Sequence, residues 1–160
     1  MNLALSGAVG AQLVPSRSTA VLSILDDEMG GTIQFATTLT TVVESVGVAQ
    51  VLVSRTGSTA GGATVDFTTV NGTAIAGTDY GALGDGTPPS GTLTFLAGQT
   101  SQRIFVPIID TAAADGVRSL TLTLSNAGPS SSTLLGARTT TTLKIIDDEA
   151  SFAFNPRPIR

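Results

Sequence analysis

The chain has 160 residues, of which 41% are hydrophobic, 12% charged and 4% aromatic, and its formal net charge is −4. It carries no basic patch, and its acidic balance argues against nucleic acid and anionic membranes as partners. Because histidine and cysteine are both absent, Ser-His-Asp and Cys-His nucleophilic sites are excluded, as are zinc sites built on these residues.

The predicted elements are all strands, because short alternating apolar runs are separated by Gly, Ser, Asn and Pro and no stretch holds a helical period. The first run, residues 33–45, is expected to bend in its middle. Pro107 would remove a donor from a sheet ladder, so its strand is expected at an edge or with a bulge. No apolar run reaches the roughly 18 residues of a membrane helix, so no membrane insertion is expected. The pattern predicts seven strands: residues 33–45, 49–56, 64–69, 91–95, 102–109, 120–125 and 141–147.

The chain also contains an internal repeat. "LALS" (3–6) matches "LTLS" (122–125), and "AVLSILDDE" (20–28) matches "TTLKIIDDE" (141–149). The two matches have slightly different offsets, which implies a small insertion in the connection. We therefore interpret the chain as a window on a tandem array: residues 1–28 are the last two strands of a preceding copy, 29–149 a full copy, and 150–160 a linker and the start of a following copy.

Both copies end a strand with Asp-Asp-Glu, although like charges about 4 Å apart repel by roughly 1 kcal/mol in water. Oxygen ligands suit hard cations such as calcium, and a bound ion would relieve this repulsion. The alternative is a solvated junction between domains, where the charges keep strand edges apart.

Five segments together carry a resemblance to a known family: "VVES-VG" (42–47), "NGTAIAGTDY" (71–80), "GTLTFLAGQT" (91–100), "FVPIID" (105–110) and "IIDDE" (145–149). In this order they resemble the Calx-β domain, the module of sodium–calcium exchanger regulatory loops that also occurs in integrin and bacterial surface proteins. The resemblance implies an all-β fold, a seven-stranded antiparallel β-sandwich of immunoglobulin-like appearance.

The resemblance also implies a calcium site at one end of the sandwich, where carboxylates from several strand ends converge. Departures from the family pattern weaken it: Thr111 stands where a second Asp is usual, and Asp115 is shorter than the expected Glu. Arg118 places a cation that repels calcium, or that pairs with Asp115 or with the terminal acidic run and so replaces the ion. For Asp79, a turn-capping role is an equal alternative. We therefore expect one weak calcium site or none. The candidate ligands are Glu44, Asp79, Asp110, Asp115, Asp147, Asp148 and Glu149.

The expected function is that of a non-catalytic, extracellular or cell-surface module, structural or adhesive, whose calcium stiffens the joint to neighbouring Calx-β repeats. The alternative is a metal-independent assembly module, in which the terminal segments add strands to copies of the same chain and form a head-to-tail fibre. An enzyme is not expected, because short loops and one small sandwich suggest no substrate cleft.

Overall fold

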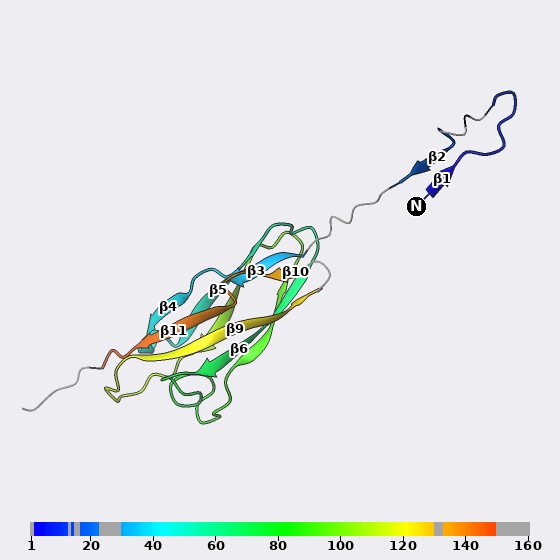
Figure 1. The fold of residues 1–160 in the computed structure, drawn as a ribbon. Helices are drawn as coiled ribbons and strands as arrows, with labels where there is room; N and C mark the ends of the chain where they lie inside the picture. Colours follow the sequence, from blue (N-terminus) through cyan, green and yellow to red (C-terminus); the bar gives the residue numbers. More distant parts are fainter. Residues whose placement is uncertain (1, 13, 15–16, 23–29, 130–132, 150–160) are drawn as a thin grey trace, which may run out of the picture.

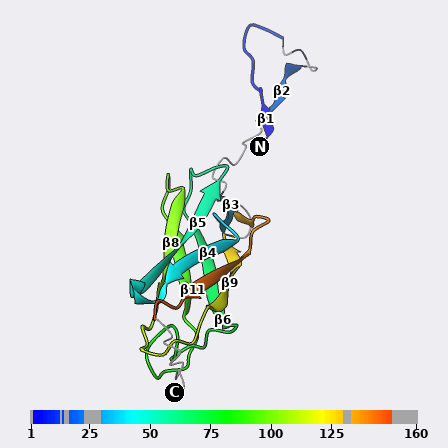
Figure 2. The same cartoon turned by 90° about the vertical axis from the view of Figure 1, so that its left-hand side faces the viewer.

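The structure is a computed structural model that describes residues 2–12, 14, 17–22, 30–129 and 133–149. Two sheets pack face to face (Figures 1 and 2). The four-stranded sheet has the order β10-β3-β5-β8, and the five-stranded sheet has the order β4-β11-β9-β6-β7. The strands are β3 (Gly31–Phe35), β4 (Leu39–Val43), β5 (Val48–Thr56), β6 (Ala63–Asn71), β7 (Ser90–Phe95), β8 (Ser101–Pro107), β9 (Arg118–Gly128), β10 (Thr133–Leu135) and β11 (Thr140–Ile146).

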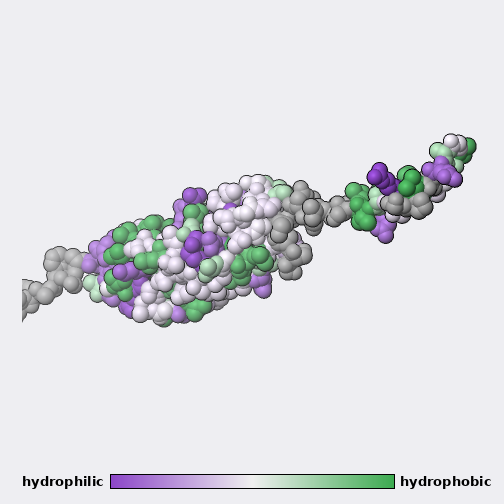
Figure 3. Space-filling view, turned by 45° about the horizontal axis from the view of Figure 1, so that its top comes forward, coloured by the Kyte–Doolittle hydropathy of each residue, from purple (hydrophilic) through white to green (hydrophobic). Residues whose placement is uncertain are grey.

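The core lies between the two sheets, and alternation along the strands fills it, because successive side chains of a strand point to opposite faces. The inward side chains of the central strands are almost completely buried. The outer faces carry many Thr and Ser residues, and Figure 3 shows a mostly pale surface with scattered apolar areas. The buried set includes Ala49, Val51, Val53, Ile104, Val106, Leu120, Leu122, Leu124, Leu143 and Ile145.

The first predicted strand is divided between the two sheets, as its expected bend required. Its first half, β3, pairs antiparallel with β5, whereas its second half, β4, pairs parallel with β11. The prediction of an entirely antiparallel sandwich is therefore wrong at two places, because β10 also pairs parallel with β3. In the described residues the sandwich has nine strand segments, because the first predicted strand supplies one segment to each sheet and the additional segment β10 joins the four-stranded sheet.

The segment β10 was not predicted from the sequence. It has three residues, of which Thr133 is buried while Leu134 and Leu135 are exposed. So short a run gives no readable alternation. Its place is set by pairing with Gly31 to Ile33 of β3.

The prediction for Pro107 is confirmed. Its strand, β8, lies at the end of the four-stranded sheet and pairs only with β5 in the described part of the chain. Pro107 stands opposite Val48, at the end of the ladder, where the missing N–H removes no pairing from a second neighbour.

A separate two-stranded sheet precedes the sandwich. β1 (Asn2–Ala4) and β2 (Thr19–Val21) pair antiparallel with each other (Figure 1). The expected continuation of the second strand through residues 23–28, and the expected linker at 150–160, lie outside the described residues. No helix in the described ranges is long and apolar enough to cross a membrane.

Candidate metal centre

Acidic residues follow three strands at the end of the sandwich where the chain leaves it. These strands are β4, β8, which is followed by Asp110, and β11. β4 and β11 run parallel, with Val43 beside Ile146. The next residues along these strands are Glu44, which opens the short 3-10 helix η2 (Glu44–Val46), and Asp147. The parallel register therefore places two acidic residues side by side, although they are about a hundred positions apart in the sequence.

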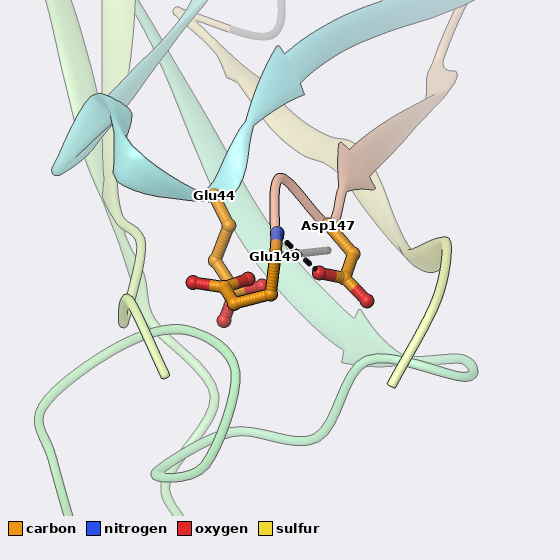
Figure 4. A group of neighbouring side chains, drawn as sticks. All are labelled: Glu44, Asp147 and Glu149. Carbon is orange, nitrogen blue, oxygen red and sulfur yellow. Dashed lines mark hydrogen bonds between the residues drawn. The ribbon is translucent and has the colours of Figure 1, made fainter. Parts of the chain in front are cut away.

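The carboxylates form two overlapping groups. Oxygen atoms of Glu44, Asp147 and Glu149 lie within 4.8 Å of one another, and so do those of Asp110, Asp148 and Glu149. Glu149 belongs to both groups. Figure 4 shows the Glu44 and Glu149 carboxylates next to each other below the ends of the two strands, with Asp147 beside them. We call these five residues the acidic cup.

Hydrogen bonds from other segments hold the cup in place. The Thr111 N–H donates to Glu44 Oε1 at 3.0 Å, and the Gly116 N–H donates to Asp147 Oδ2 at 2.5 Å. The Ser45 hydroxyl donates to Asp148 Oδ2 at 2.6 Å. The carboxylates are therefore oriented by loop backbone and by η2, and their positions do not depend on strand geometry alone.

The protonation behaviour of the cup reflects its crowding. Backbone N–H donation, first from Gly116 and then from Glu149, lowers the pKa of Asp147 below its ordinary value. The pKa of Glu149 is raised, first by its side-chain hydrogen bond with Asp147 and then by desolvation and the charges of Asp148 and Glu44. A proton on Glu149 thus relieves repulsion that a cation could also relieve.

The donor set fits a hard cation. All five side chains offer carboxylate oxygens, the ligand type that calcium prefers. Glu44 is buried, at 4% exposure. In the described part of the chain, Glu149 Oε2 is buried and has no hydrogen-bond partner. A buried carboxylate oxygen without a partner is costly, and a bound ion would satisfy it.

Asp79 and Asp115 are outside these two groups, although both are candidate ligands from the sequence. The buried Asp79 accepts the N–H of Ile75 at Oδ2 over 2.6 Å and so closes the turn of the 71–80 loop. Asp115 Oδ2 lies 3.2 Å from Arg118 Nη2. The hydrogen bond and charge of Asp115 raise the pKa of Arg118, with smaller contributions from Asp79 and Glu44. The cation of Arg118 therefore stands beside the cup and is paired with its own acid.

Three contributors to the cup were not identified from the sequence. They are the hydroxyl of Ser45 and the backbone N–H groups of Thr111 and Gly116. Backbone donors have no sequence signature. Ser45 follows Glu44 directly, and only the folding of η2 shows that it faces Asp148.

A sequence model of the Calx-beta domain matches residues 26–149. The chain belongs to the Calx-beta family. Its sandwich resembles the crystal structure of the apo-form Calx CBD1 domain, with 29% identity over 74% of this chain and 97% of that one, and a TM-score of 0.65. It also resembles the crystal structure of the calcium binding domain CBD12 of CALX1.1. The identity is 29% over 73% of this chain and 46% of that one, and the TM-score is 0.65.

The Calx CBD2 domain shares the fold of this Calx-beta domain, with a TM-score of 0.67 at 19% identity and coverage of 76% and 89%. This chain spans less than half of the CBD12 structure. A comparison with curated proteins gave no match. The family assignment and the all-β sandwich thus agree with the resemblance carried by the sequence motifs.

Proposed function

We propose that this Calx-beta domain binds one calcium ion in the acidic cup and acts without catalysis, as a structural repeat that the ion stiffens. The observation that carries the proposal is the position of Glu149. Its carboxylate belongs to both groups of acids, and its Oε2 is buried without a hydrogen-bond partner in the described residues.

The charge balance supports one ion. The cup contains five carboxylates, whereas the neighbouring Asp115 is already paired with Arg118. The guanidinium of Arg118 also interacts electrostatically with Glu44 of the cup, and this positive charge raises the cost of a second dication there. Calcium would be held by the Glu44, Asp147 and Glu149 group, with Asp110 and Asp148 completing the oxygen set. The ion supplies only charge neutralisation and a fixed geometry at the end of the strands.

The place of the cup suggests what the ion does. Asp147 to Glu149 directly precede the residues that lead out of the sandwich. An ion there would fix the direction in which the chain leaves and so stiffen a joint to a following repeat. Weak sites with dissociation constants of about 10⁻⁴–10⁻³ M are typical of extracellular modules. We therefore place the protein at the cell surface or outside the cell, in a structural or adhesive array.

The test is thermal unfolding in chelator and in about 10 mM calcium, with magnesium as the ion control. For a dissociation constant of about 1 mM, mass action stabilises the folded state by about 1.4 kcal/mol. For a domain of this size, the midpoint should rise by about 5 °C. An equal rise in magnesium, or none in calcium, contradicts the proposal.

Two variants separate ligation from general charge effects. Glu149→Gln removes the shared ligand and should abolish the calcium-dependent rise. Asp85→Asn removes the same charge from an exposed loop outside both groups and should leave the rise intact. If both variants respond to calcium as the parent chain does, the cup is not the site.

A further inference from the structure

The N-terminal hairpin and the closing hairpin of the sandwich have the same register. In β1–β2, Leu3 stands opposite Ala20 and Ala4 opposite Thr19. In β9–β11, Leu122 stands opposite Thr141 and Thr123 opposite Thr140. The repeat aligns Leu3 with Leu122 and Ala20 with Thr141, so each cross-strand pair of the first hairpin falls on a pair of the second.

Two features beyond the ladder also correspond. The Leu5 N–H donates to the Ser18 carbonyl at 2.8 Å, and the aligned Leu124 N–H donates to the aligned Thr139 carbonyl, also at 2.8 Å. Gly7 has a φ of 70°, and the aligned Asn126 has a φ of 49°. Asn126 lies within β9, at the irregularity of the β6–β9 ladder between Ser125 and Gly128, and Gly7 has the same sign of φ at the aligned position.

The two hairpins differ in what covers their apolar side chains. Leu122, Leu124 and Leu143 of the closing hairpin are at most 2% exposed. The aligned Leu3, Leu5 and Leu22 are 45%, 66% and 46% exposed. Burying leucine side chains stabilises a folded structure, and an isolated two-stranded hairpin is at best marginally stable in water. The first hairpin thus carries the leucine side chains of a core-forming hairpin, but these side chains are exposed.

An arginine of the closing hairpin also has a counterpart in the N-terminal hairpin. Arg138 Nε donates to the Phe35 carbonyl of β3 at 2.7 Å and so ties the closing hairpin to the four-stranded sheet. The repeat aligns Arg17 with Arg138, and Arg17 is exposed. The hairpin therefore carries a donor for a strand equivalent to β3, as well as side chains for the core.

We propose that residues 1–28 close a second Calx-beta sandwich, whose other strands are a segment of the same kind as residues 30–119, lying upstream in the same polypeptide. A second copy of this chain does not offer the place, because its own β9 is already paired on one side with β11 and on the other with β6. The hairpin needs a sandwich that lacks these strands. The proposal rests on the family assignment and does not depend on calcium.

The test extends the full chain at its N-terminus with a second copy of residues 30–119, so that Met1 takes the place of Leu120. In the sandwich, Thr123 pairs with Thr68 of β6, and Ala4 aligns with Thr123. A cysteine pair is placed at Ala4 and at Thr68 of the added copy. The chain has no other cysteine, and adjacent strands bring Cα atoms within the range that a disulfide spans.

The experiment is carried out in chelator, so its outcome is separate from that of the calcium proposal. We expect most chains to form the intramolecular cross-link under mild oxidation. The matched control keeps the cysteine at Ala4 and moves its partner to Ser54 of the added copy, on β5 of the other sheet, and should not cross-link. Absence of the Ala4–Thr68 cross-link, or equal cross-linking in the control, overturns the proposal.

Hydrogen exchange gives a second readout that does not depend on cysteine chemistry. In the extended chain, the ladder amides of β1 and β2 should exchange about a hundredfold or more slowly than in the parent chain. Replacing Leu3 and Leu5 by Asp should remove this protection without changing exchange in β9 and β11. Exchange of β1 and β2 that is equally fast in the parent and extended chains would overturn the proposal.

Discussion

Arg55 Nε donates a hydrogen bond to the carbonyl oxygen of Gly30 over 2.7 Å, and so fixes the point where the chain enters the sandwich. Its Nη2 donates to the Gly61 carbonyl at 2.6 Å and its Nη1 to the Leu96 carbonyl at 3.4 Å. Arg55 is only 2% exposed. One buried guanidinium thus joins two loops to the entering chain. Arg55 lies near the end of β5, whereas Glu44 of the acidic cup lies just before the start of that strand, so the two are at opposite ends of the sandwich.

Replacing Arg55 by Met should therefore be costly. The methionine fills similar volume but leaves three carbonyl oxygens without their donor, each at a cost of about 1–3 kcal/mol before relaxation. We expect the free energy of unfolding to fall by about 3 kcal/mol, as measured by urea titration. Arg103→Met, at an exposed position of β8, is the matched control and should change stability by less than about 0.5 kcal/mol. Equal effects of the two substitutions would show that the buried hydrogen bonds contribute nothing.

Gly77 allows a close approach between two loops of the 71–86 region. Its φ is 80°, and a Cβ built on it would lie 2.4 Å from the Gly86 nitrogen. Gly98 also has a φ of 80°, but a Cβ there would meet nothing within 4 Å. Gly98→Ala should cost only the left-handed strain, about 1 kcal/mol.

Gly77→Ala should cost about 2 kcal/mol more than Gly98→Ala, because backbone must also move. Chemical denaturation of both variants measures the difference. Since the backbone angle is the same, a difference close to zero would mean that the Gly77 loop adjusts freely, contrary to the structure.

Asp66 should make the stability depend on acid pH. Its carboxylate accepts hydrogen bonds from the Thr92 hydroxyl at 2.6 Å and from Asn126 Nδ2 at 3.0 Å. These two hydrogen bonds lower the pKa of Asp66, Thr92 contributing most. Because the pKa is lower in the folded than in the unfolded state, the stabilisation is present above the unfolded value of about 3.9 and is lost as the pH falls through the folded value.

Asp66→Asn should therefore lower the urea midpoint at about pH 7 and have a much smaller effect at about pH 2. Asp85→Asn, in an exposed loop, should have little effect at either pH. An Asp66→Asn effect that stays constant across the range would show that the lost interaction does not depend on ionisation.

Arg118 should limit the calcium affinity of the cup. Its guanidinium pairs with Asp115 and also interacts electrostatically with Glu44. Arg118→Gln removes a like charge from the neighbourhood of the ion and frees Asp115. We expect calcium to bind about threefold to tenfold more tightly, which corresponds to about 1 kcal/mol.

Isothermal titration calorimetry measures this change directly. Arg103→Gln alters the net charge by the same amount but lies on β8 of the other sheet, so its effect should be small. If Arg118→Gln binds calcium more weakly than the parent chain, the arginine organises the cup instead of opposing the ion.

The alternation of apolar residues was enough to predict every strand of the sandwich except β10, and the part of the core that these strands supply. Odd-numbered residues of β5 point inward from Ala49 to Val53, as expected, and the same period carries Arg55 inward as well. Alternation depends only on neighbouring residues along one strand. It could not show that Arg55 would find three carbonyl oxygens, because these belong to segments distant in the sequence.

For the acidic cup, too, the sequence determined one part and the tertiary structure another. The sequence and its family motifs identified the acidic residues as candidate ligands. The internal repeat also showed that the N-terminal hairpin corresponds in sequence to the closing hairpin. The tertiary structure decided which acids meet: the parallel register of β4 and β11 brings Glu44 beside Asp147, whereas Asp79 turns to the Ile75 N–H and Asp115 to Arg118. A carboxylate binds whichever donor or charge lies within reach, and that choice is made by loops that only the folded chain brings together.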